Sequence, residues 1–277
     1  MKIQLPTPYR GQCIFCKSSK QLTDEHVISK SVRRNLPKTE SVIPVAGNNG
    51  LKPETALNIV LSKAVCARCN NGWMSRVEKD FVRIFKHQLY SLKQRFVDSD
   101  GQKSTATWAV KVALLIQLYT SAASGQQLGH FVPDSHLQWL GKETSPPPET
   151  IVWIAAIHNP IGLAHCQPSS LATSRDTTPD AYFVSFSVGH LLFNVFGPEF
   201  ITTADGNRIR PQTLGPPKRL AETLIEIWPG NSRDLMWPPM KPVLADELRA
   251  LEDWPSEALG IPTERLWSSH PPMRPSL

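Results

Sequence analysis

The stretch Cys66-Ala67-Arg68-Cys69-Asn70-Asn71-Gly72-Trp73 decides the fold of the N-terminal part of this 277-residue chain. Its C-x-x-C pair runs directly into two asparagines, and apolar residues with helical spacing follow. A second pair, Cys13-Ile14-Phe15-Cys16, precedes it, and the acidic-histidine step Asp24-Glu25-His26 lies between the two pairs. The chemistry of this region must therefore be explained from four thiols, one histidine and their neighbours.

The two cysteine pairs predict a structural zinc ion bound by Cys13, Cys16, Cys66 and Cys69. Tetrahedral zinc accepts four thiolates, and two C-x-x-C turns supply them from two tight loops. Four thiolate ligands leave no open coordination position, so we expect the zinc to be structural rather than catalytic. The 49 residues between the pairs exceed the gap of a simple zinc ribbon. A compact insert that contains the acidic-histidine step must fill this space.

Positive charge is concentrated in the N-terminal third of the chain, although the net charge of the whole is only +6. Residues 1–95 contain 17 Lys and Arg against 6 Asp and Glu, a net of +11. Residues 96–277 contain 13 against 18, a net of −5. A basic segment joined to a mildly acidic remainder predicts that the first third meets a polyanion.

The composition indicates a globular protein, because apolar residues make up 40% of the chain and charged residues 19%. Residues 1–12 are polar and interrupted by proline, so we expect no signal peptide. The longest apolar run, 109–123, contains Lys111, Gln117 and Thr120 and is too short to span a bilayer. We therefore expect a cytoplasmic protein without a membrane partner.

Helical and strand patterns both occur, which predicts a fold of the α+β class. In the N-terminal part we expect a strand over residues 57–65 and a helix that starts near Asn70 or Asn71, both of which suit an N-cap. The turn-forming cluster 98–101 should end that helix and mark a domain boundary.

Beyond this boundary the pattern predicts a helix over residues 107–123 and then a helix-plus-antiparallel-sheet arrangement. Residues 181–196 indicate two strands around Gly189-His190. Shorter elements are expected at residues 134–140, 151–157, 161–166, 220–227 and 244–251. We therefore predict one domain over residues 1–97 and an α+β domain of unassigned role over residues 104–277.

The acidic-histidine step contains groups that phosphodiester hydrolysis needs: a base for water, a ligand for a cation, and neighbours that hold phosphates. His26 titrates near neutrality and suits the base, and Glu25 offers oxygen to a hard cation such as Mg²⁺. Asn70, next to a zinc ligand, can present an amide oxygen to the same cation, and a helix N-terminus there offers N–H groups to a phosphate. The simpler alternatives are a hydrogen-bonded loop histidine at His26 and a helix cap at Asn70. Asn71 is able to exchange roles with Asn70.

The pattern C-x-x-C, acidic-His-Val-Ile and C-x-x-C-Asn resembles the four-cysteine HNH endonucleases, whose core is a zinc-stapled ββα-metal finger. The ending Cys-Asn-Asn-Gly-Trp is similar to a bacterial and phage branch of that family. The resemblance covers residues 13 to about 80. It implies Glu25 and Asn70 as ligands of a catalytic Mg²⁺ or Mn²⁺ and His26 as the general base. It also implies an N-terminal ββα-metal domain and a setting in phage defence or mobile-element biology.

One position departs from the family pattern. The middle asparagine of the family stands on the second strand, about nine residues before the last ligand, and this chain has Leu61 there. Asn58 is three residues early and fits only if the strand or its loop is lengthened. Because this asparagine normally holds the loop that carries the base, the departure bears on the geometry of His26.

Four cationic residues follow the histidine, namely Lys30, Arg33, Arg34 and Lys38. A solvated charged face is the usual explanation of such a run. Beside a nuclease site, the same residues are expected to contact phosphates of a nucleic acid without reading its sequence.

The sequence therefore predicts a metal-dependent endonuclease that cleaves nucleic acid, with DNA favoured over RNA. The alternative is a catalytically inactive, zinc-stabilised module that binds nucleic acid, which the departure at Leu61 motivates. A protein-interaction scaffold is the third hypothesis, favoured by the large apolar C-terminal part. The sequence indicates neither the cleavage specificity nor the oligomeric state.

Overall fold

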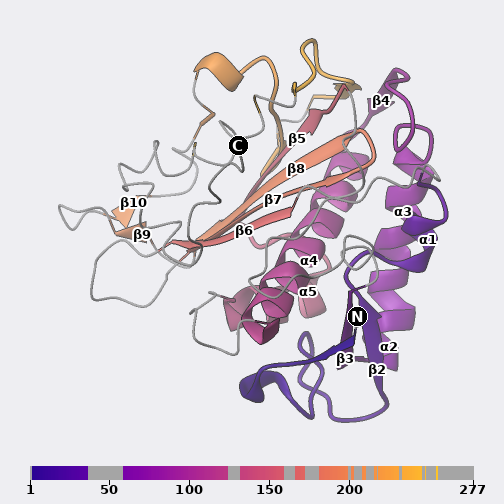
Figure 1. Cartoon of the computed structure of the whole chain (residues 1–277), viewed down its shortest axis with the longest axis vertical. Helices are drawn as coiled ribbons and strands as arrows, with labels where there is room; N and C mark the ends of the chain where they lie inside the picture. The colour runs from indigo at the N-terminus through magenta and orange to yellow at the C-terminus, as the bar shows by residue number, and fades with distance from the viewer. Residues whose placement is uncertain are drawn as a thin grey trace, which may run out of the picture.

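The computed structural model describes residues 2–36, 59–123, 132–158, 166–171, 181–198, 201–202, 208–209, 215–216, 218–230, 233–244, 247 and 254. Lys38 and Asn58 lie outside the described residues. Within these ranges the protein is a mixed helix-and-sheet structure with antiparallel sheets, which confirms the predicted α+β class (Figure 1). None of the described helices is long and apolar enough to cross a membrane.

The helical elements are η1 (Thr7–Tyr9), α1 (Lys30–Arg33), α2 (Ala67–Cys69), the π-helical turn η3 (Asn70–Met74), α3 (Ser75–Phe85), α4 (Ser99–Ala123), α5 (Asp134–Glu143) and η5 (Lys218–Leu220). The strands are β1 (Lys2–Gln4), β2 (Leu22–His26), β3 (Val60–Cys66), β4 (Arg95–Val97), β5 (Ile151–Ala156), β6 (Cys166–Leu171), β7 (Ala181–Val188), β8 (Leu191–Pro198), β9 (Ile201–Thr202), β10 (Arg208–Ile209), β11 (Ile225–Trp228) and β12 (Leu235–Trp237).

A small sheet with the order β1-β3-β2 holds the N-terminal region together. β2 runs antiparallel to β3, and the register shifts between the pairs Thr23–Val65 and Glu25–Leu61. Lys63, inside this shift, adopts a φ of 51°, and its backbone N–H donates to the Asp24 carboxylate at 3.1 Å. The Asp24 side chain therefore stabilises the irregular part of β3. The strand ends at Cys66, which is the N-cap of α2.

The larger sheet has the order β11-β5-β8-β7-β6 and is antiparallel throughout. β7 and β8 form the predicted hairpin around Gly189, which has a φ of +60°. Only glycine fits there, because a Cβ would lie 1.9 Å from the carbonyl oxygen of Leu89. All residues of both strands are buried, since each face of the sheet is covered and alternate side chains enter two separate hydrophobic clusters.

Helix α4 is the centre of the molecule, and its residues 105–119 are all buried. It packs against α3 and against the larger sheet, and in Figure 1 both helices lie on one side of that sheet. The helix begins at Ser99, eight residues before the predicted start. The reason is a cap: Asp98 accepts a hydrogen bond from the backbone N–H of Gly101 at 2.8 Å, so residues expected to form a turn instead start a helix.

One hydrophobic core extends across residues 98–103, the boundary expected from the sequence. Phe81 of α3 stacks on Trp108 of α4 with ring centroids 3.7 Å apart, and Phe193 of β8 packs on both. The same cluster of buried residues includes members of the small sheet and of the large sheet. The N-terminal and C-terminal segments therefore share their core.

Candidate metal centre and nuclease site

Four sulfur atoms converge beside the small sheet. The Sγ atoms of Cys13, Cys16, Cys66 and Cys69 all lie within 4.8 Å of one another, and those of Cys16 and Cys66 are 3.5 Å apart. A zinc–sulfur bond of about 2.3 Å in a tetrahedral centre puts its sulfur atoms about 3.8 Å apart. The cluster therefore fits a structural metal ion such as zinc, and it brings together the four predicted ligands.

Backbone hydrogen bonds form the two cysteine loops and join them to the sheet. In the first loop, Cys13 donates its N–H to Ser18 at 2.8 Å and accepts from Lys17 at 2.9 Å. Ile14 donates to Ala64 of β3 at 3.0 Å. The hydrogen bond with Cys69 is the largest cause that lowers the pKa of Cys13 to about 4, and it raises the pKa of Cys69. Burial raises the pKa of Cys16, so Cys13 is the thiol of this cluster for which the thiolate, the form that binds metal, is favoured.

His26 ends β2 and is half-buried. Burial, together with the positive charges of Arg33 and Lys30, lowers its pKa below the ordinary value of 6.5. None of the residues that the structure describes forms a hydrogen bond or an ion pair with its ring. The imidazole is therefore neutral at pH 7 and able to accept a proton, as a general base must.

Glu25 points into the protein and belongs to a buried ion cluster. Its Oε1 lies 3.3 Å from Nζ of Lys111, and the same ammonium lies 2.6 Å from Oε1 of Glu78. The Lys111 side chain is completely buried, and those of Glu25 and Glu78 are 5% and 15% exposed. Burial raises the pKa of Glu25 although Lys111 opposes it. The two carboxylates raise the pKa of Lys111 despite its burial, so the lysine stays charged.

The arrangement around Glu25 does not fit a divalent cation. The carboxylate is enclosed, and an ammonium group already neutralises it. Asn70 offers a better ligand for a cation through its amide oxygen. Its Nδ2 donates a hydrogen bond to Oγ1 of Thr23 at 3.0 Å, and its Oδ1 has no hydrogen bond within the described ranges. That contact brings Asn70 against β2, the strand of Glu25 and His26, but no described hydrogen bond joins it to either residue.

The helix expected near Asn70 or Asn71 begins slightly earlier, at Ala67, and is interrupted by non-helical angles at Gly72, with φ −90° and ψ −112°. Cys66 is the N-cap of α2, and Asn70 already has helical angles, with φ −61° and ψ −53°. The backbone turns into the helix within the C-x-x-C loop itself, so Asn70 is no N-cap. Asn71 is exposed.

The basic run lies on α1, next to His26. Ser29 caps this helix by accepting a hydrogen bond from the backbone of Val32 at 3.4 Å, and the helix packs against α3. Lys30 and Arg34 are exposed, and Arg33 is half-buried.

Two residues at this site, Lys111 and Glu78, are not part of the cysteine and acidic-histidine pattern from which the site was predicted. A charged residue within the apolar run 109–123 is the signal that pointed to Lys111, since such a residue needs a buried partner. Its partners are 33 and 86 residues away in the chain, and only the packing of α3, α4 and β2 identifies them.

No protein-family model, curated protein or solved structure matched the chain.

Proposed function

We propose that the protein is a metal-dependent endonuclease of the HNH type, which hydrolyses phosphodiester bonds in nucleic acid, in DNA more than in RNA. His26 carries the proposal: a half-buried, neutral imidazole without a partner among the described residues lies beside a basic helix, on the strand pair that also delivers Cys66 at its other end. Lys30 and Arg34, exposed on that helix, attract phosphates.

In the proposed reaction His26 removes a proton from a water molecule whose oxygen attacks phosphorus. The bond between phosphorus and the 3′ oxygen breaks, and that oxygen takes a proton from solvent. One product strand then carries a 5′-phosphate. The requirement for Mg²⁺ or Mn²⁺ comes from the family resemblance, and no step here passes through the cation because Glu25 is paired with Lys111.

The order of elements supports the proposal, because β2, β3 and the helical segment 67–85 come in the order strand, strand and helix, with the short helix α1 between the two strands. The shift in β3 also bears on the displaced asparagine. Between the pairs Thr23–Val65 and Glu25–Leu61, β3 carries three residues where β2 carries one. This lengthening by two residues leaves Asn58, which lies outside the described residues, one position from the place that the family pattern gives the asparagine.

The test is incubation of zinc-loaded protein with supercoiled plasmid in Mg²⁺ or Mn²⁺. We expect nicked or linear products from the wild type and a loss of about 100-fold or more in rate from His26→Ala. His87→Ala, at an exposed histidine bonded to Tyr90, is the matched control and should cleave normally. EDTA should stop the reaction and excess Mg²⁺ restore it, with the zinc content measured to show that the structural ion stays bound. Intact plasmid with the wild type, or equal cleavage by His26→Ala, would refute the assignment.

The enclosure of Glu25 by Lys111 favours a second candidate, a zinc-stabilised module that binds nucleic acid without cleaving it. For this candidate we expect salt-dependent binding to DNA that Arg34→Ala weakens and Lys79→Ala, at an exposed position of α3, does not. Binding without cleavage under every divalent cation would support the module. Cleavage that depends on His26 would exclude it.

A further inference from the structure

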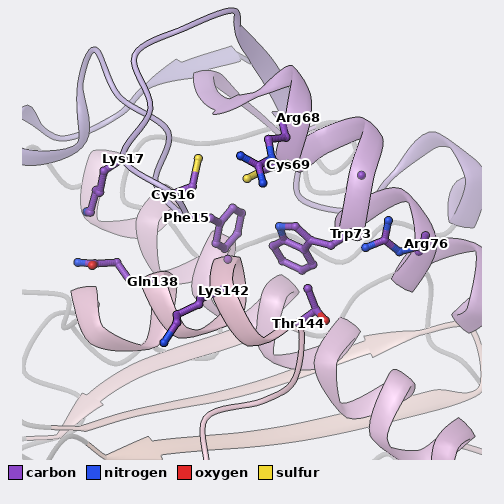
Figure 2. Close-up of a pocket in the computed structure, with 12 residues that line it drawn as sticks. Phe15, Cys16, Lys17, Arg68, Cys69, Trp73, Arg76, Gln138, Lys142 and Thr144 are labelled. Atoms are coloured by element: carbon purple, nitrogen blue, oxygen red, sulfur yellow. The ribbon is translucent and has the colours of Figure 1, made fainter.

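A cavity of about 770 Å³ opens beside the zinc cluster, between the helical segment 67–85 and α5 (Figure 2). Phe15 from the first cysteine loop and Trp73 from η3 lie at its base, their rings edge to face with centroids 5.0 Å apart. Both side chains belong to the core, with Phe15 1% and Trp73 5% exposed, so little of their surface faces the cavity. On the other side α5 approaches closely at Gly141, where a Cβ would lie 2.6 Å from the carbonyl oxygen of Phe15. The volume is typical of small-ligand sites, which measure about 300–1,000 Å³.

The lining of the cavity is strongly positive. Within the described ranges it includes no carboxylate and four cationic side chains, Lys17, Arg68, Arg76 and Lys142. Lys17 forms an ion pair with Asp134. Lys142 forms one with Glu143, with 3.3 Å between Nζ and Oε1. The two arginines are exposed and have no ion pair or hydrogen bond among the described residues. The uncompensated charge therefore comes from Arg68 and Arg76.

The two arginines flank Trp73 on the same side of the helical segment. Arg68, Gly72 and Arg76 all line the cavity, and Gly72, with non-helical angles of φ −90° and ψ −112°, kinks the helical segment between the two arginines. A Cβ at Gly72 would meet nothing within 4 Å, so the backbone leaves open space between the arginines. Guanidinium groups match phosphate oxygens with two parallel hydrogen bonds, and two of them along a groove suit successive phosphates.

The opposite side of the same helical segment belongs to the nuclease site. Asn70 donates to Thr23 of β2, and Glu78 binds Lys111 of α4. None of Glu25, His26 and Asn70 lines the cavity. The cavity is therefore a second site, separated from His26 by the helix that both share.

We propose that this cavity binds an unpaired nucleotide of a nucleic-acid strand, with phosphates on Arg68 and Arg76 and the base inside the cavity. A base that remains paired in a duplex cannot enter a cavity of this size, whereas an unpaired base can. This proposal rests on the proposed function, which gives nucleic acid as the partner. The preferred substrates are then strands that contain an unpaired segment.

The test is a fluorescence-anisotropy titration of the full, zinc-loaded chain with a labelled single strand and with the same strand in a duplex, without divalent cations. We expect the single strand to bind about tenfold more tightly than the duplex. Arg68→Ala and Arg76→Ala should each weaken single-strand binding about tenfold and change duplex binding little.

Lys79→Ala is the matched control, because it removes one exposed charge of α3 outside the cavity. Thermal melting and zinc content show whether each variant is folded. Equal affinity for strand and duplex, or an equal loss with Lys79→Ala, would overturn the inference. If adenosine 5′-monophosphate bound through both arginines and the protein showed no preference for single strands over duplex, the cavity would be a site for a free nucleotide and the inference would be overturned.

The result is separable from the fate of the nuclease proposal. His26→Ala should keep the preference for the single strand, because its ring is outside the cavity. Cleavage without any such preference would remove this inference and leave the nuclease. A preference lost with the arginine variants, in a protein that never cleaves, would support the cavity and remove the nuclease.

Discussion

The ammonium group of Lys111, in the central helix α4, forms ion pairs with β2 and α3. It is completely buried, and both of its partners are carboxylates from other elements, Glu25 of β2 and Glu78 of α3. A buried charge is tolerated only when its partners surround it, and removing one partner leaves the others unpaired in a medium of low polarity. The triad therefore holds β2, α3 and α4 in one arrangement.

We expect Lys111→Met to lower the free energy of unfolding by about 3–5 kcal/mol at pH 7, because two carboxylates are left without their cation. Denaturant unfolding followed by circular dichroism measures this loss, with Lys79→Met at an exposed position as the control. The double variant Lys111→Met with Glu25→Gln should recover part of the loss, because it removes one of the uncompensated charges. A single variant as stable as the wild type would show that the triad does not contribute.

The pH dependence of cleavage should report on His26. Its pKa is lowered by burial and by Arg33 and Lys30, so the neutral base is present above a pKa that lies below 6.5. The cleavage rate should therefore be flat through neutral pH and fall only as the pH drops through that lowered pKa. Lys30→Met removes one of the positive charges and should move the fall toward higher pH. Rates measured between pH 5 and 8 on plasmid would contradict this assignment if the midpoint lay above 6.5.

At the scale of elements, the zinc cluster joins two loops whose own secondary structure is slight. The first loop is attached to β3 through Ile14, and the second passes directly into α2. Metal binding in such a site contributes directly to the stability of the fold, because the unfolded chain has no preformed site. Helix α5 also packs on the first loop at Gly141. A change in the conformation of this loop would therefore disturb the packing of α5 in the C-terminal part.

Cys66→Ser should therefore abolish stoichiometric zinc binding and lower the melting temperature by about 10 °C or more. The measurements are zinc released on thiol oxidation, with one ion per chain expected from the wild type, and thermal melting. Lys20→Ser, at an exposed position close to the same loops, should leave both unchanged. A Cys66→Ser protein with the zinc content and melting temperature of the wild type would rule out the four-cysteine centre.

The sequence allowed prediction of elements wherever a local pattern was sufficient. Cysteine spacing identified the ligand set, and the period-two run around Gly189 predicted the β7–β8 hairpin. Prediction failed where one residue had two local meanings. Asp98 suits a turn as well as a helix cap, and the asparagines after Cys69 suit a helix start as well as its interior. The direction of Glu25 could not be predicted at all, because it depends on a lysine 86 residues away.

At the scale of the whole molecule, the N-terminal and C-terminal segments depend on each other for their interiors. Residues 1–97 contribute Phe81, Ile84 and Phe85 to the core, and α4 and the larger sheet cover them. The zinc cluster, the small sheet and the ion triad are connected to α4 by Lys111 and by the stacking of Phe81 on Trp108. The N-terminal region therefore closes its core only with residues of the C-terminal part.

We therefore expect a fragment of residues 1–97 to fail to fold as a stable monomer. Without α4, the apolar face of α3 is exposed to water, and Glu25 and Glu78 lose their shared cation, so the fragment loses burial and ion pairing together. Size-exclusion chromatography and thermal melting of the fragment, expressed with zinc and compared with the full chain, measure this dependence. Aggregation, or the absence of a cooperative transition, is the expected result. A soluble monomer that binds one zinc and melts cooperatively would instead make the region an independent domain, and its core would then have to close without Trp108.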